Sequence, residues 1–559
     1  MPRTLGIAFL IVTVLGSSCR APEPGSSAPD GVPAEHDAVP PAAVAAGTPE
    51  AAEAGAEILR AGGNAMDAAV AIALSLAVTE PAGSGLGGTA YVLVHPPGGP
   101  AVAIRGPSRA PARIPDGVDA KKLRNHQATT VPSFLKVLEV AWRRHGSGRI
   151  AWAKLFVPAI RHAEDGFRLG PFRYRSLVRN RKILSTRPSA AAVFLLPGGK
   201  LPPPDHRLRQ PALARTLRRL AEHGADDFYK GAIAEAIARD MAEHGGWITR
   251  EDLASFPPPE EVPALHGTYR GRDVFALPPP SGGWVALQAL NILELVPARE
   301  LALDHVNRPI WMAEALRAAY RSRRRSPVPD QGDYTRAVDR RTSKKTAETL
   351  FRAIHPPGGG ETTHFSLVDS TGLAVAVTQS INSYFGARVL APELGFLYNN
   401  YMCEFTTRKK GHPFTLAPDA LAYSSMGALI FARDGKPELV LGSPGGGRTI
   451  SAVVQTASAR LDGGCSVEAA VREPRMHYTA RTEVLHVERF PPERWQVLSL
   501  QSRGFEVSIP VTTFRRDGLD SYFGGVNAVA WENGRWVGAA DPRRDGAVRY
   551  CPPASRNGV

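Results

Sequence analysis

The residues with the clearest potential for chemistry are a threonine and the segment that precedes it. Thr362 follows His355 to Glu361, a run of two prolines and three glycines that is poorly suited to pairing into a sheet. If the chain is cut before Thr362, one residue carries both a hydroxyl and a new α-amino group. Such an amine has a pKa of about 7.7–8.0 and can accept the hydroxyl proton. Thr362 is therefore a candidate nucleophile, although Thr-Thr pairs also occur in ordinary strands.

A second segment, Ser443 to Thr449, contains Pro444 and three consecutive glycines. It follows a predicted strand and enters a predicted helix. Glycines at such a turn let backbone N–H groups point at one spot, and the helix N-terminus adds a partial positive charge. This arrangement suits an oxyanion hole, and it suits a phosphate equally well. No Gly-Lys-Ser/Thr sequence follows, which argues against a nucleotide phosphate.

The elements that position these segments change character at Thr362. Before it, helical spacing is seen over 49–80, with a turn at Gly62-Gly63-Asn64, over most of 130–255, and over 341–354. After it, alternating residues on both sides of the turn Asp369–Gly372 predict a hairpin. Later strands are predicted at 428–432, 438–441, 484–487, 507–508, 526–531 and 537–541, and helices at 449–460 and 466–471. This order predicts stacked sheets covered by helices.

Short motifs along the chain resemble those of the γ-glutamyltransferase family of N-terminal-nucleophile hydrolases, over roughly residues 49–545. No single motif is decisive, but their order is specific. The motifs are Gly55 with Gly62–Ala69, Glu80–Gly88, Pro158–Ile160 with Gly166-Phe167, Pro278–Gly283, Thr362–Ser366, Phe385-Gly386, Gly395–Asn400, Ser424–Met426, Ser443–Gly446 and Pro474–His477.

The resemblance implies an α+β fold, a four-layer αββα sandwich made as one precursor and cut between Glu361 and Thr362 into a heterodimer. The large subunit would cover 48–361 and the small subunit 362–559. The resemblance also implies γ-glutamyl amide hydrolysis or transfer through a covalent γ-glutamyl ester. Expected partners are a small γ-glutamyl substrate such as glutathione and a water, amino acid or peptide acceptor. No cofactor and no metal are expected.

The resemblance carries over to individual site residues. Thr362 would attack the amide, Gly445 and Gly446 would hold the oxyanion, and Ser380 stands where the family usually has a supporting threonine. Asn382, Tyr401 and Glu404 occupy the positions that meet the substrate α-amino group; Glu404 replaces the usual Asp, and Tyr401 replaces a more polar residue. The pair expected at the α-carboxylate is Ser424 and Ser425.

One departure leaves the substrate open. The family's Arg-Glu pair clamps the α-carboxylate in a bidentate manner, but here Arg105 and Arg109 lie in a segment without that glutamate. Arg105 is the candidate for the substrate carboxylate, and Arg109 is the alternative. The segment resembles the cephalosporin-acylase-like branch, so a glutaryl or cephalosporin-type acylase of the same fold is an alternative. A catalytically inert surface lipoprotein is an alternative of another class.

The N-terminus predicts export. Arg3 and the apolar run Leu5–Leu15 have signal-peptide proportions, and Gly16–Cys19 is similar to a lipoprotein cleavage box that would leave Cys19 lipidated. We therefore assign 1–19 to a signal peptide and 20–47, rich in Pro, Ala, Gly and Ser, to a disordered tether. Ordinary signal-peptide cleavage near Cys19 is the alternative. The expected location is periplasmic or extracellular, with the membrane contacted only through a lipid on Cys19.

The formal charge is +14, and the basic residues are scattered along the chain. One tight cluster, Arg321–Arg325, continues a helical pattern and predicts a solvated basic helix face. Because the chain lacks an aromatic-interleaved basic repeat and zinc-ligand spacing, a nucleic-acid partner is not expected. His364 and His477 are expected to be structural.

Overall fold

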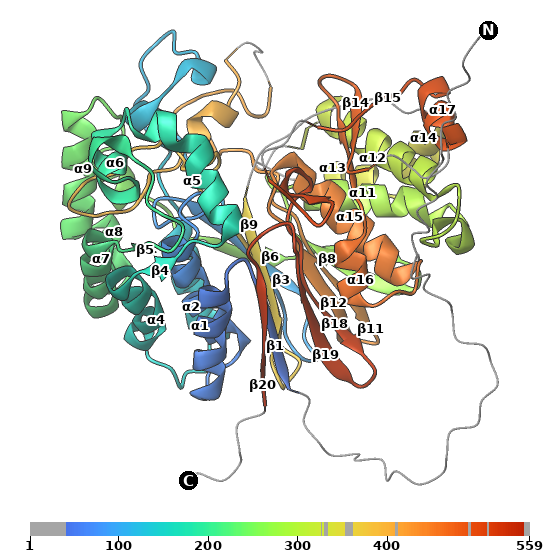
Figure 1. Ribbon diagram of the computed structural model, residues 1–559, viewed down its shortest axis with the longest axis horizontal. Coiled ribbons are helices and arrows are strands. Elements are labelled where there is room, and N and C mark those ends of the chain that lie inside the picture. Colours follow the sequence, from blue (N-terminus) through green and yellow to red (C-terminus); the bar gives the residue numbers. More distant parts are fainter. Residues whose placement is uncertain are drawn as a thin grey trace, which may run out of the picture. The chain divides into compact units, whose positions relative to one another are not determined.

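The computed structural model describes residues 41–325, 327–328, 334–352, 362–407, 412–489, 494–510 and 514–552. Two antiparallel sheets form the centre of this part of the chain (Figure 1). The first has seven strands, in the order β20 (Ala547–Cys551), β1 (Ala42–Ala46), β9 (Thr363–Val368), β10 (Ala374–Ser380), β2 (Thr89–His95), β3 (Val102–Gly106) and β6 (Glu260–Pro263).

The second sheet has six strands and is antiparallel throughout. Its order is β19 (Arg535–Ala540), β18 (Asn527–Glu532), β12 (Lys436–Gly442), β11 (Ala428–Arg433), β8 (Arg272–Ala276) and β7 (Leu265–Tyr269). Because side chains alternate along a strand, each sheet presents one face to the other sheet and one to helices. Buried residues such as Tyr91, Val368, Val440 and Val529 form the core between the sheets.

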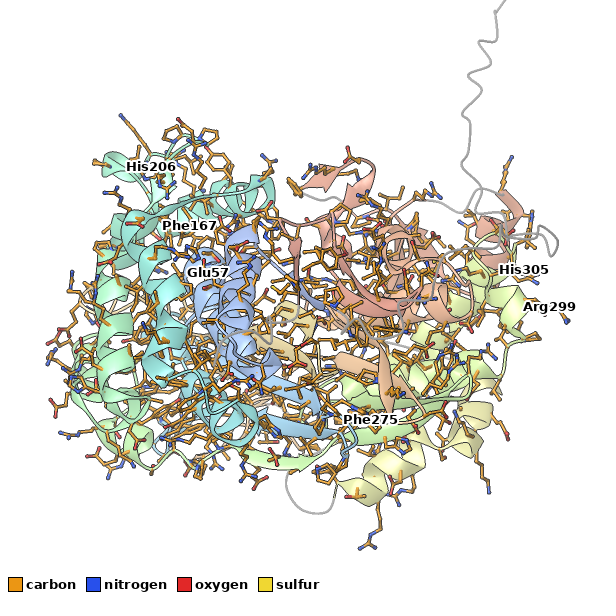
Figure 2. The ribbon with its side chains drawn as sticks, turned by 90° about the horizontal axis from the view of Figure 1, so that it is seen from below. Glu57, Phe167, His206, Phe275, Arg299 and His305 are labelled. Carbon is orange, nitrogen blue, oxygen red and sulfur yellow. The ribbon has the colours of Figure 1, made fainter. Side chains whose placement is uncertain are left out.

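Helices cover the outer face of each sheet, which makes four layers (Figure 1). The first sheet is covered by α1 (Pro49–Arg60), α2 (Ala65–Thr79) and α3 (Phe134–His145). Outside them, α4 (Trp152–Asp165) packs on α2, and α7 (Pro211–His223) packs on α4. The second is covered by α11 (Gly283–Glu294), α15 (Gly447–Leu461) and α16 (Val467–Arg472), and α12 (Arg308–Arg325) packs on α11. Figure 2 shows Glu57 of α1 and Arg299 on opposite sides of the sheets.

The remaining elements lie around these layers. The helices are α5 (Pro171–Leu184), α6 (Pro188–Phe194), α8 (Asp226–Tyr229), α9 (Ala232–Glu243), α10 (Arg250–Ala254), α13 (Thr335–Thr342), α14 (Lys344–Arg352) and α17 (Arg494–Ser502). The small sheets contain β13 (Met476–Thr479), β14 (Val484–Val487) and β15 (Glu506–Ser508); β16 (Arg515–Arg516) and β17 (Leu519–Asp520); and β4 (Phe167–Arg168) and β5 (Arg207–Leu208).

The predicted turn at Gly62-Gly63-Asn64 separates α1 from α2, and its residues explain why. Gly62 has φ +88°, a conformation that glycine adopts without steric cost. Asn64 then caps α2, because its side chain accepts from the N–H groups of Met66 and Asp67 while the Asp67 carboxylate accepts from Asn64 N at 2.9 Å. The cap fixes where α2 begins, and α2 ends at Thr79, next to Glu80.

Three expectations need correction. The predicted end of the tether at residue 47 is wrong, because Ala42–Ala46 form β1, a fully buried strand between β20 and β9.

The single helix predicted over 341–354 is two helices, α13 and α14, separated at Ser343. The predicted solvated basic face is wrong at two positions, since Arg321 and Arg323 are only 3% and 7% exposed, whereas Arg324 and Arg325 are exposed. Residues 1–40, Cys19 included, and 353–361 lie outside the described residues.

No helix in the described ranges combines the length and the apolar character needed to cross a bilayer. Cys403, Cys465 and Cys551 are free thiols.

Candidate active site

Thr362 directly precedes β9 and is 2% exposed. The side chains of His364, Ser366 and Val368 face the second sheet, and strand alternation places Thr362 on the same side. Gly442, the last residue of β12, packs on the His364 ring so closely that a Cβ would lie 2.4–2.6 Å from ring atoms. The glycine-rich loop that begins at Ser443 therefore starts across the intersheet space from the segment that opens with Thr362.

Ser380 is brought to Thr362 by strand register. Gln379 of β10 pairs with Thr363 of β9, and the next position outward sets Ser380 opposite Thr362. The Ser380 hydroxyl accepts a 2.7 Å hydrogen bond from the backbone N–H of Asn382, which fixes the turn after β10. The fold thus places the predicted nucleophile and the predicted supporting hydroxyl at adjacent strand ends.

Asn382 and Glu404 are in direct contact. Asn382 has φ +75°, an unusual backbone conformation for a residue other than glycine. Its side-chain amide donates at 3.2 Å to Glu404 Oε1 and at 3.2 Å to the carbonyl of Asn400. Glu404 ends the short 3-10 helix Tyr401–Glu404. One carboxylate and one amide oxygen are therefore available here for a substrate ammonium group.

Tyr401 carries a buried phenol that is influenced by Ser380 and by the serine pair. Burial raises the pKa of its hydroxyl, and the side chains of Ser380 and Ser424 act in the opposite direction. The backbone N–H of Ser424 donates to the carbonyl of Pro280 at 3.2 Å, which holds the serine pair against the Pro278–Gly283 loop. Tyr401 therefore lies close enough to Ser380 and Ser424 for both to affect its hydroxyl.

Ser425 leads to a residue that sequence reasoning missed. Its hydroxyl accepts a 2.8 Å hydrogen bond from Nη2 of Arg323, the buried arginine near the end of α12. Arg323 stands in a run of basic residues, and the spacing of that run gave no sign that one of them turns inward.

The glycine loop has the conformation that its residues permit. Gly445 has φ +125°, and Gly446 has φ +59° and ψ −124°, in regions that side chains with a Cβ rarely enter. The Ser443 hydroxyl donates to the carbonyl of Pro444 at 2.7 Å and accepts from Gly525 N at 3.1 Å, which anchors the loop. α15 starts at Gly447, so the helix N-terminus lies directly behind the predicted oxyanion donors.

Arg105, the sequence-based candidate for the substrate carboxylate, is already engaged. Nη1 donates to the carbonyl of Pro279 at 3.0 Å, and Nη2 is paired with Glu260 at 2.5 Å. The side chain lines a pocket with Arg109, Pro257–Glu260 and Leu421. Its role toward a substrate stays a prediction.

Glu80 is a second residue to which the sequence assigned no role, although it begins the motif Glu80–Gly88. It is 4% exposed and accepts a hydrogen bond from the Thr363 hydroxyl. Burial raises the pKa of its carboxyl, while nearby Arg544 and Arg173 act in the opposite direction. Only the folded chain reveals that Glu80 touches the residue after Thr362.

The two histidines behave as structural groups. His364 hydrogen-bonds to the hydroxyls of Thr378 and Ser366, and His477 to that of Ser451. Burial lowers the pKa of His364 to about 3 and holds that of His477 well below its usual value. Both rings are therefore neutral at working pH.

One group of possible metal ligands occurs in the described part of the chain, away from these residues. Ligand atoms of His126, Asp240 and His244 lie within 4.8 Å of one another. The Asp240 carboxylate already receives His126 Nε2 at 3.1 Å and the Tyr398 hydroxyl at 3.0 Å. The hydrogen bonds within the group satisfy it without an ion.

Known proteins match this chain over most of its length. The gamma-glutamyltranspeptidase family model matches residues 51–551. The glutathione hydrolase proenzyme of Escherichia coli (strain K12) is 33% identical over 530 residues, covering 88% of this chain and 89% of its own. The acylase ACY 1 proenzyme of Pseudomonas sp. (strain SE83) is 32% identical over 526 residues, covering 89% and 91%.

Among solved structures, cephalosporin acylase from Bacillus halodurans superposes with a TM-score of 0.82 at 26% identity, over 94% of this chain and 99% of that one. Because the family model and these relatives match most of the chain, the chain belongs to the gamma-glutamyltranspeptidase family of enzymes.

Proposed function

We propose that this protein hydrolyses or transfers γ-glutamyl amides such as glutathione, with Thr362 as an N-terminal nucleophile released by self-cleavage after Glu361. The observation that carries the proposal is the position of Thr362, opposite Ser380 at adjacent strand ends and across from the loop that contains Gly445 and Gly446. The glutathione hydrolase proenzymes among its relatives support the same reaction.

In this mechanism the α-amine of Thr362 accepts the proton of its own hydroxyl while the oxygen attacks the amide carbon of the substrate. The backbone N–H groups of Gly445 and Gly446 stabilise the oxyanion that forms on the carbonyl oxygen. The C–N bond then breaks, the leaving amine takes the proton, and an ester to Thr362 remains. Water or an acceptor amine attacks that ester and regenerates the hydroxyl.

N-terminal sequencing and intact mass test the cut site and the nucleophile together. Wild-type protein should give two fragments, one ending at Glu361 and one starting at Thr362, and Thr362→Ala should stay in one piece. Thr363→Ser is the matched control, because it changes the neighbouring threonine, keeps a hydroxyl, and should still cleave. An active enzyme that is continuous through Glu361-Thr362 would defeat the mechanism.

An acylase that removes a glutaryl-type side chain is the second candidate. It is favoured by the resemblance to the ACY 1 proenzyme. Turnover of γ-glutamyl and glutaryl anilides by the cleaved enzyme separates the two. A higher kcat/KM for the glutaryl anilide would establish the acylase.

We also propose that the protein is exported and anchored through a lipid on Cys19. The apolar run Leu5–Leu15 followed by Gly16–Cys19 supports this. Labelling of cells with radioactive palmitate should mark the wild type and leave Cys19→Ala unmarked, and a labelled Cys19→Ala protein would refute the assignment.

A further inference from the structure

Arg323 is a buried cation beside the candidate site. Its Nη2 donates to Ser425 at 2.8 Å, and its guanidinium carbon lies 4.5 Å from the centre of the Tyr423 ring. Its Nη1 is buried and has no hydrogen-bond partner. A buried donor without an acceptor is costly, and more so when it is charged. The position of Arg323 therefore favours a ligand that brings an acceptor.

The charge of Arg323 is also uncompensated at close range. Within the described residues no carboxylate oxygen lies within 4.0 Å of its guanidinium, and Glu404 is the acidic group that acts on it electrostatically. Burial lowers the pKa of Arg323 to about 10, so the side chain stays charged at neutral pH. A buried cation without a paired anion is costly, whereas an incoming carboxylate offsets that cost.

Position, rather than the unpartnered nitrogen alone, distinguishes Arg323. Arg321, two residues earlier on α12, is as deeply buried and also has unpartnered nitrogens, but its Nη2 faces Glu483 at 3.6 Å and touches none of the site residues. Arg105 is held by Glu260 and Pro279. Arg323 contacts Ser425 directly and acts electrostatically on Glu404.

We propose that Arg323 recognises a carboxylate at the end of the substrate's acyl group, through Nη1 and through the Ser425 hydroxyl that it orients. This inference rests on the proposed function and extends it to a substrate class. The γ-glutamyl and glutaryl groups both carry a carboxylate at the same distance from the reacting carbonyl, and only the γ-glutamyl group adds an ammonium. Arg323 recognises the carboxylate that both acyl groups carry. Glu404 and Asn382 recognise the ammonium that only the γ-glutamyl group carries.

Four anilides that differ only in these charges test the inference: γ-glutamyl (both charges), glutaryl (carboxylate only), 4-aminobutyryl (ammonium only) and butyryl (neither). Arg323→Met should lower kcat/KM for the γ-glutamyl and glutaryl anilides about 10- to 100-fold, and leave the other two within about threefold. Arg323→Lys should recover part of the preference, because it keeps the charge and loses the planar fork. Arg321→Met is the matched control and should keep the wild-type pattern.

A readout without turnover separates this inference from the proposed reaction. Calorimetry with cleaved protein should show tighter binding of glutamate and glutarate than of 4-aminobutyrate and butyrate, and Arg323→Met should remove that preference. If wild type cleaves no anilide but binds glutarate through Arg323, the carboxylate site stands and the proposed reaction fails. The inference is overturned if Arg323→Met weakens all four substrates equally, if it keeps the carboxylate preference, or if Arg105→Met alone abolishes it.

Discussion

The side-chain hydroxyl of Thr363 donates a 2.6 Å hydrogen bond to Oε2 of Glu80, and both residues are buried. Glu80 immediately follows α2 and lies 3.9 Å from Arg544 through its other oxygen. This contact attaches the first residue of β9 to the helical layer. Because neighbours on a strand face opposite ways, the anchoring of Thr363 on one face fixes Thr362 on the other.

Removal of that contact should loosen the start of β9. Thr363→Val keeps the shape of the side chain but leaves a buried carboxylate oxygen without its donor, which should cost about 1–3 kcal/mol of unfolding free energy. Urea unfolding is best measured in the uncut Thr362→Ala background, so that the chain stays continuous. Thr363→Ser should remain close to its parent. An unchanged midpoint for Thr363→Val would show that the hydrogen bond does not hold this strand.

The hydroxyl of Ser380 should matter for chemistry more than for folding. It accepts a hydrogen bond from the N–H of Asn382, at the strand end opposite Thr362. We expect Ser380→Ala to lower kcat on the order of 100-fold, with KM changed far less, because the hydroxyl supports charge that develops during attack. Ser380→Thr restores the hydroxyl and should recover most of the rate. Equal kcat values for the alanine and threonine variants would exclude this role.

The backbone of Gly446 should tolerate no side chain. At φ +59° and ψ −124° an alanine is strained by about 1–3 kcal/mol, and relief of that strain would turn the N–H away from the oxyanion. Gly446→Ala should lower kcat on the order of 10²- to 10³-fold. Gly435→Ala is the matched control, since Gly435 also has positive φ (+71°) but lies in open space at the turn between β11 and β12. The control should retain full activity.

Alternation and turn residues predicted the β9–β10 hairpin, because each strand buries side chains of different character on its two faces. They did not predict β1, since Ala42–Ala46 are small, apolar and buried on both faces, and so show no alternation. The burial of Arg323 was not predicted for a related reason. Its burial is set by Tyr423 and Ser425, about a hundred residues further along the chain, and by nothing in its own segment.

The buried His364 should make the fold sensitive to acid. Burial lowers its pKa to about 3, whereas an unfolded histidine has a pKa of about 6.5. Between these values the unfolded chain binds a proton that the folded chain does not, so stability is present above pH 6.5 and is lost as the pH falls toward 3. From pH 7.5 to 5.0, this residue should account for a loss of about 2 kcal/mol of unfolding free energy.

Urea unfolding of His364→Gln in the Thr362→Ala background should show a correspondingly weaker pH dependence than its parent. The ring packs against the hydroxyls of Thr378 and Ser366 and the backbone of Gly442. Identical pH dependence in the two proteins would mean that the ring takes up a proton in this buried position, and would contradict the prediction.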